Sequence, residues 1–191
     1  MLFRSWGELG PGDEIVLVAS SGLHANGASL ARLLASRLPD GYASELPSGE
    51  TLGEALLRPS VMYAPLVAAL LQTDAGVTYI SHVTGHGLLK LMRPRTSLTY
   101  RIRRLPKVPE LLQFLVARAG LDAHAAYSTF NMGAGYAVYC KPRAGETVAA
   151  TARQLGLDAV LAGGVEEGPR QVILEPVGVR YGSEELELSV T

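Results

Sequence analysis

The feature that most constrains the fold is a change of pattern that occurs twice along the chain. Residues 14–19 read EIVLVA, a continuous apolar run typical of a strand covered on both faces. The polar loop SSGLHANG follows at 20–27, and apolar residues then recur at helical spacing over 28–38. The same order returns at 76–84, where GVTYISHVT predicts a strand and GHGLLKLM behind it a short helix with Thr84 as N-cap.

The rest of the chain continues this alternation of strands and helices. We expect further helices at 51–57, 63–71, 110–120 and 145–157, and further strands at 97–102, 135–140, 159–165 and 171–176. Alternation of this kind predicts a layered α/β or α+β domain. Because no long linker divides the chain, we predict one domain over 1–191, in which 166–191 forms C-terminal strands and a tail.

The composition excludes several classes of function. The 17 Lys and Arg residues against 18 Asp and Glu residues give no overall charge for binding nucleic acid or an anionic membrane, so an anion must be bound locally. Cys140 is the only cysteine, which excludes an intrachain disulfide and multi-cysteine zinc sites. No apolar run approaches the roughly 20 residues of a membrane span, and no signal peptide is recognisable. We expect a soluble, cytoplasmic protein.

The loop at 20–27 has the chemistry of an anion site. Where a strand leads into a helix, the first helix N–H groups lack partners inside the helix, and the helix dipole adds partial positive charge. Glycines bring the backbone close to a ligand, and hydroxyl and amide groups suit phosphate oxygens. The alternative is that the side chains of the loop only cap the helix. The candidate residues are Ser20, Ser21, Gly22, His24, Asn26 and Gly27.

Two later loops have related compositions. The loop SHVTGHG at 81–87 follows a predicted strand, and its two histidines leave a metal site as a weaker alternative, because no carboxylate follows closely. The segment TFNMGAG at 129–135 precedes a predicted strand, and the alternative there is a tight turn with a buried Phe130. The candidate residues of these loops are His82, Thr84, Gly85, Gly87, Asn131 and Gly133.

Other motifs support little chemistry. The sequence lacks a GxSxG nucleophile elbow, a P-loop and a CxxC pair, and in GHGLLK the last glycine of a dinucleotide fingerprint is replaced by Lys90. The basic stretch RIRRLPK at 101–107 has four positive charges and only one aromatic neighbour, so we interpret it as a solvated edge, with contact to phosphate or nucleic acid as the weaker alternative.

Taken together, the loops resemble one known family. The similar segments are GDEIVLVASSGLHANGASLARLL, TLGEALLRPSVMYAPLVAALL, ISHVTGHGLL and YSTFNMGAGYAVY, over roughly 12–165. They are similar to the C-terminal half of aminoimidazole ribonucleotide (AIR) synthase, the phosphoribosylformylglycinamidine cyclo-ligase of purine synthesis. The resemblance implies the fold of that family's C-terminal domain, an α/β sandwich with a mixed β-sheet. The same superfamily holds formylglycinamidine ribonucleotide synthetase, selenophosphate synthetase and thiamine monophosphate kinase.

The resemblance also implies an activity. In that family ATP phosphorylates an amide oxygen of the substrate, and a substrate nitrogen then closes the imidazole ring. By position, the residues of the three loops would form three walls around a ribose phosphate or nucleotide phosphate. The family's N-terminal half, which binds ATP with acidic Mg²⁺ ligands, is not in this sequence. We therefore expect ATP and Mg²⁺ only together with an N-terminal partner, no tightly bound cofactor on the isolated chain, and leave a homodimer open.

The sequence departs from the family pattern at defined places. His86 stands where the family has the middle glycine of HxTGGG, and we expect it to narrow the site. The family's Glu-Asn-Ile-Pro-Arg segment is replaced by LLKLMRP, and its Glu-Met pair by Ala125 and Ala126. Two functions stay open: the substrate-binding half of an ATP-dependent cyclo-ligase or a relative, such as selenophosphate synthetase or thiamine monophosphate kinase, or a stand-alone binding or regulatory module without turnover.

Overall fold

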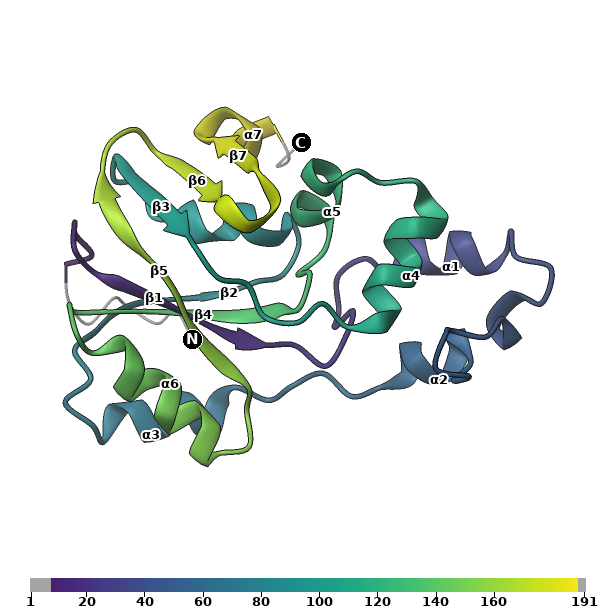
Figure 1. Cartoon of the computed structure of the whole chain (residues 1–191), viewed down its shortest axis with the longest axis horizontal. Helices are drawn as coiled ribbons and strands as arrows, with labels where there is room; N and C mark the ends of the chain where they lie inside the picture. Colours follow the sequence, from purple (N-terminus) through teal and green to yellow (C-terminus); the bar gives the residue numbers. More distant parts are fainter. Residues whose placement is uncertain (1–7, 189–191) are drawn as a thin grey trace.

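The computed structural model describes residues 8–188. Its strands are β1 (Glu14–Ala19), β2 (Val77–His82), β3 (Leu98–Ile102), β4 (Ala134–Cys140), β5 (Ala159–Glu167), β6 (Gln171–Leu174) and β7 (Val179–Gly182). They form one sheet in the order β2-β4-β1-β5-β3-β6-β7 (Figure 1). The pair β3 and β6 is parallel and the other neighbours are antiparallel, so the sheet is mixed, as predicted.

The helices cover both faces of this sheet. They are α1 (Ala28–Ala35), α2 (Leu52–Leu57), α3 (Ala64–Leu71), α4 (Glu110–Ala119), α5 (Ala123–Thr129), α6 (Gly145–Gln154) and α7 (Ser183–Leu188), with 3₁₀ turns η1 (Gly41–Ala43), η2 (Gly87–Met92) and η3 (Glu175–Val177). Within residues 8–188, no helix is long and apolar enough to cross a membrane.

Alternation along β1 separates two apolar cores. Val16 and Val18 point to one face, where they pack with α3 and α6, the helices beneath the sheet in Figure 1. Ile15 and Leu17 point to the other face, which is covered by η2, α4 and α5. All four side chains are fully buried, which explains the continuous apolar run in the sequence. The layered α/β prediction is therefore confirmed, and β1 lies at its centre.

The structure corrects several local expectations. Thr84 does not cap a helix: His86 and Gly87 adopt left-handed conformations, with φ of 73° and 49°, and the element that follows is a 3₁₀ helix. Two successive left-handed residues prevent an α-helix from starting at Thr84. The helix predicted over 28–38 ends at Ala35, ahead of Pro39.

Besides the 3₁₀ turns η1 and η3, three elements were not assigned individually from the sequence. Helix α5 has only seven residues, and it starts because the Asp122 side chain accepts the N–H of Ala125 at 2.8 Å. The tail contains β7 and α7, which are too short to give a periodic signal.

Candidate anion-binding site

The loop SSGLHANG leaves β1 at the centre of the sheet, where both neighbouring strands hold it. The backbone N–H of Ala19 donates to the carbonyl oxygen of Asp158 at 2.8 Å, just before β5. The N–H of Ser20 donates to the carbonyl oxygen of Gly133 at 2.9 Å, just before β4. Because β1 lies between β4 and β5, the first and third predicted loops are brought together although more than 100 residues separate them.

Asn131 joins these two loops. Its Oδ1 accepts the hydroxyl of Ser20 at 2.8 Å and the N–H of Gly133 at 2.9 Å. Its Nδ2 donates to the carbonyl oxygens of Gly22 at 2.8 Å and Leu23 at 3.3 Å. A primary amide has two donors and two principal acceptor positions, so these four bonds saturate the side chain. Asn131, which is only 5% exposed, therefore positions the loops.

The second predicted loop lies on the other side of SSGLHANG. The Nδ2 of Asn26 donates to the carbonyl oxygen of Thr129 at 3.0 Å, and a Cβ added to Gly85 would lie 3.2 Å from the Oδ1 of Asn26. The N–H of Thr84 donates to the carbonyl oxygen of His82 at 3.0 Å, which turns the chain away from β2. The structure thus brings residues of all three predicted loops to one end of the central strands.

Helix α1 begins without a side-chain cap. Its N-cap is Gly27, with φ of 92°, and no side chain among residues 8–188 accepts a hydrogen bond from the first turn. Ser20 and Asn26 bond elsewhere, so the alternative that these side chains only cap the helix is wrong. Ala28 and Ser29 are exposed, which leaves the first turn accessible to an anion.

Two histidines, the partly buried His24 and the exposed His82, flank the aromatic ring of Tyr63. The ring centroid of Tyr63 lies 6.2 Å from that of His24 and 5.9 Å from that of His82. The Nε2 of His24 accepts the N–H groups of Ser21 at 3.2 Å and Val61 at 3.4 Å. Burial lowers the pKa of both histidines, and His82 lowers the pKa of His24 further. The lowered pKa values favour the neutral form of both rings, which makes these histidines weak sources of positive charge for an anion.

A cavity of about 850 Å³ opens beside Ser20 and Ser21. Its volume is within the range of roughly 300 to 1,000 Å³ that is usual for small-molecule sites. Gly133 allows the backbone of Lys107, a lining residue, to come close, because a Cβ on Gly133 would lie 2.5 Å from the carbonyl oxygen of Lys107. The other lining residues are Ala19, Arg58, Leu105, Pro106, Lys107, Pro109, Glu110, Gln113, Asp158, Ala159 and Val160.

The charged side chains of this cavity are available for a ligand. Within residues 8–188, Lys107, Glu110 and Asp158 have no hydrogen-bond or ion-pair partner for their side chains. Arg58 is the exception, since it is ion-paired with Glu50. The cavity therefore combines two serine residues, a lysine and two carboxylates at the end of β1.

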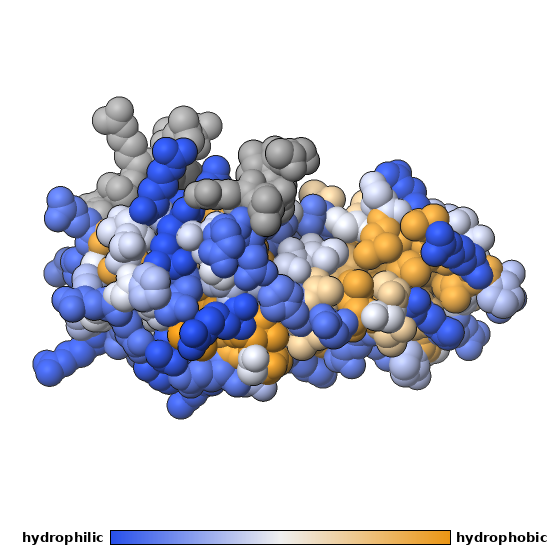
Figure 2. All heavy atoms as spheres, turned by 90° about the horizontal axis from the view of Figure 1, so that it is seen from above, coloured by the Kyte–Doolittle hydropathy of each residue, from blue (hydrophilic) through white to orange (hydrophobic). Residues whose placement is uncertain are grey.

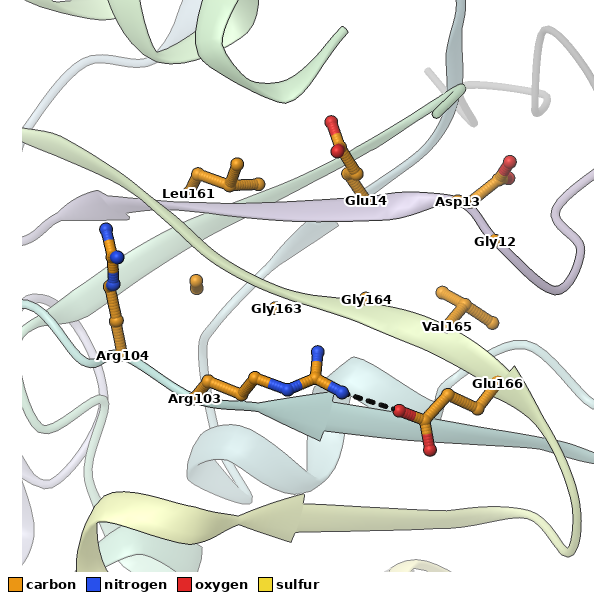
Figure 3. A pocket seen from close by; sticks show the side chains of 11 residues that line it. Gly12, Asp13, Glu14, Arg103, Arg104, Leu161, Gly163, Gly164, Val165 and Glu166 are labelled. Carbon is orange, nitrogen blue, oxygen red and sulfur yellow. Dashed lines mark hydrogen bonds and ion pairs between the residues drawn. The ribbon is translucent and has the colours of Figure 1, made fainter. Parts of the chain in front are cut away.

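A second hollow, of about 420 Å³, has a different character (Figure 3). It lies over the glycine-containing part of β5, and its charged groups are mostly satisfied. Arg103 donates to Glu166 at 2.8 Å, and Glu14 accepts the N–H of Gly145, the first residue of α6, at 2.7 Å. The buried Asp13 accepts hydrogen bonds from a threonine and a lysine, and its side chain points away from Arg103. We therefore assign the candidate site to the larger cavity.

Sequence reasoning missed the charged lining of that cavity. Within the basic stretch 101–107, Arg101 on β3 and Arg103 just after it pair with Glu166 on the neighbouring strand β5, whereas Lys107 lines the cavity. Asp158 gives no sequence signal, because its place depends on the pairing of β5 with β1. Across residues 8–188, no group of three or more His, Cys, Asp and Glu residues is arranged to hold a metal ion.

Comparison with known proteins gives the context of the site. Residues 10–174 match the model of a family described as AIR synthase related protein, C-terminal domain. A phosphoribosylformylglycinamidine cyclo-ligase of Anaeromyxobacter is 38% identical over 172 residues, which are 87% of this chain and 49% of that protein. The enzyme of the same name from Methanothermobacter thermautotrophicus is 35% identical over 137 residues, which are 71% of this chain and 40% of that protein.

Solved structures show the same fold. The hydrogenase maturation protein HypE of Escherichia coli superposes with a TM-score of 0.59 at 25% identity, over 94% of this chain and 52% of that one. A thiamine-monophosphate kinase of Stenotrophomonas maltophilia superposes with a TM-score of 0.57 at 18% identity, over 91% of this chain and 53% of that one. The chain thus spans about half the length of the relatives that it matches.

Proposed function

Because the chain belongs to the family of AIR synthase related proteins, as their C-terminal domain, we propose that it is the substrate-binding half of an ATP-dependent cyclo-ligase of the phosphoribosylformylglycinamidine type. The observation that supports this most is the meeting of three polar loops beside a cavity with a free lysine. In this proposal the loops hold the phosphate of a ribose phosphate or nucleotide of purine biosynthesis.

The donors at the loops suit a phosphate group. The open first turn of α1 and the ammonium group of Lys107 interact favourably with phosphate oxygens. The hydroxyl groups of Ser20 and Ser21 donate to Asn131 and to the carbonyl oxygen of Pro59 in the free chain, so they have to turn toward a phosphate to bind it. A phosphate held in this way fixes the rest of the substrate relative to the protein, which is the usual contribution of a binding domain to catalysis. ATP and Mg²⁺ would come with an N-terminal half that supplies the nucleotide site.

Exposed apolar side chains form candidate surfaces for contact with a partner protein. Figure 2 shows apolar side chains gathered at the end of the molecule that carries α1 and α4, where Leu33 is 46% exposed. An apolar hollow of about 440 Å³ lies between α3 and the end of β2, and Met62 and Leu71 at its rim are 75% and 52% exposed. Exposed patches of this kind often mark protein interfaces. We assign them to contact with the N-terminal half.

Calorimetric titration with ribose 5-phosphate tests the phosphate site. We expect the wild-type chain to bind ribose 5-phosphate, to bind free ribose far more weakly, and to release the ligand when inorganic phosphate competes. In this proposal the Ser21 hydroxyl, which donates to the carbonyl oxygen of Pro59 at 2.7 Å in the free chain, turns toward the phosphate. The change Ser21→Ala should then weaken binding by about 10-fold, because a hydrogen bond to a charged group is lost. The control Ser36→Ala removes a hydroxyl that bonds only to the carbonyl oxygen of Leu33, and should have no effect.

Two outcomes would contradict the proposal. One is equal affinity of the wild type and Ser21→Ala for ribose 5-phosphate, which would place the ligand elsewhere. The other is a clear preference for thiamine monophosphate over ribose 5-phosphate, which would favour the thiamine monophosphate kinase branch of the superfamily.

A further inference from the structure

We infer that Glu110 and Asp158 recognise the hydroxyl groups of a ribose whose phosphate lies on the side of Ser21 and Lys107. This inference rests on the proposed function and adds the part of the ligand that the loops do not explain. It concerns the same cavity of about 850 Å³, which both carboxylates line.

Backbone contacts place the two carboxylates and the lysine around the end of β1. Asp158 is fixed next to Ser20 because its carbonyl oxygen accepts the N–H of Ala19 at 2.8 Å. Lys107 is fixed because its carbonyl oxygen packs against Gly133, where no Cβ would fit. Glu110 is the first residue of α4, three residues after Lys107. The backbone positions from which the lysine and the carboxylates extend are therefore fixed around the end of β1.

The charged groups of the cavity suit a ligand with two kinds of groups, and Lys107 and Asp158 are exposed and so accessible to it. A bare phosphate would be attracted by Lys107 and repelled by the carboxylates of Glu110 and Asp158, which have no partner within residues 8–188. An ionised carboxylate only accepts hydrogen bonds, so its best neutral partner is a donor such as a sugar hydroxyl. Acidic side chains bind ribose hydroxyls in this way in dinucleotide-binding folds. A ribose phosphate supplies the anion and the donors in one molecule.

The test compares three ligands on two variants, with EDTA present so that no metal ion can bridge a carboxylate and a phosphate. The ligands are ribose 5-phosphate, 2-deoxyribose 5-phosphate and inorganic phosphate. The variants are the double change Glu110→Ala with Asp158→Ala, and the control Asp74→Asn, an exposed acidic residue between α3 and β2.

We expect the wild type and the control to prefer ribose 5-phosphate over the deoxy sugar by about 10-fold. The double variant should lose that preference and bind ribose 5-phosphate more weakly, while it binds inorganic phosphate more tightly because two negative charges are gone. Misfolding would weaken the binding of both ligands, so it cannot produce these opposite changes in affinity. Wild-type binding without a preference, or parallel changes for both ligands in the double variant, would overturn the inference and leave the phosphate site standing. Absence of any wild-type binding would overturn both proposals.

Discussion

Gly87 occupies a position that a side chain cannot share. Its φ is 49°, and a Cβ there would lie 2.1 Å from the carbonyl oxygen of Tyr127 and 2.6 Å from that of Phe130. The sequence motif suggested a glycine that lets a ligand approach the backbone. The structure shows that this glycine lets η2 approach α5, and so it holds the second loop in place.

Gly87→Ala should therefore destabilise the fold. We expect a loss of about 1 to 3 kcal/mol in the free energy of unfolding, from overpacking against two carbonyl oxygens. Gly178→Ala is the matched control, because its φ of 65° is similar and nothing lies within 4 Å of the added Cβ. Gly178→Ala should lower the free energy of unfolding by only about 1 kcal/mol, which is the cost of a side chain in the left-handed conformation. Urea titrations measure both values, and equal losses would show that the close contact is relieved by small movements.

At the scale of single residues, the sequence predicted the polar loops better than it predicted the residues that line the cavity. The residue types of SSGLHANG and TFNMGAG predicted a polar junction, and Phe130 is buried as expected. The bond from Ser20 to Asn131 spans 111 residues, and the sequence contains no signal for such a distant contact. Lys107 was interpreted as part of a solvated edge for the same reason: its place follows from packing against Gly133.

At the scale of secondary-structure elements, the order of the strands in the sheet decides which loops lie next to one another. The runs of β1, β2, β3 and β4 were predicted within one or two residues, because each is bounded by glycine, proline or polar residues. Their spatial order was not predictable from periodicity, since β1 pairs with the distant strands β4 and β5. This order places the end of β2 near the loop after β1, and so brings His82 close to His24.

The histidine pair predicts a dependence of stability on pH. Burial lowers the pKa values of His24 and His82 in the folded state below the ordinary value of about 6.5. As the pH falls through about 6.5, the unfolded chain takes up protons that the folded chain does not, so the free energy of unfolding decreases. The decrease should continue down to the lowered pKa values of the folded state.

Chemical denaturation at a series of pH values checks this sign. His82→Gln removes one titrating group and its repulsion of His24, so the slope between about pH 7 and 5 should become smaller. At about pH 8, where both histidines are neutral in either state, the same variant should show no charge effect on stability. A slope that is unchanged by His82→Gln would mean that other groups cause the acid sensitivity.

For the whole molecule, we propose that this chain binds the substrate and that an N-terminal half supplies the ATP site. The chain spans about half the length of its relatives and supplies loops, hydroxyl groups and a lysine that suit a phosphate. Phosphoryl transfer from ATP also needs groups that hold Mg²⁺, usually carboxylates together with phosphate oxygens. Loss of even one preorganised electrostatic group can slow a reaction by roughly 100-fold to 1,000-fold.

The most direct test of this division is ADP release in the presence of Mg²⁺ and formylglycinamidine ribonucleotide. We expect no substrate-dependent ADP from the highly purified chain alone, and ADP release when an N-terminal half of an AIR synthase is added. The variant Ser21→Ala should reduce the complemented activity, because the substrate phosphate is held less firmly. Steady, substrate-dependent ADP production by the chain alone would contradict the account, since it would require a complete ATP site within the residues to which we assign only substrate binding.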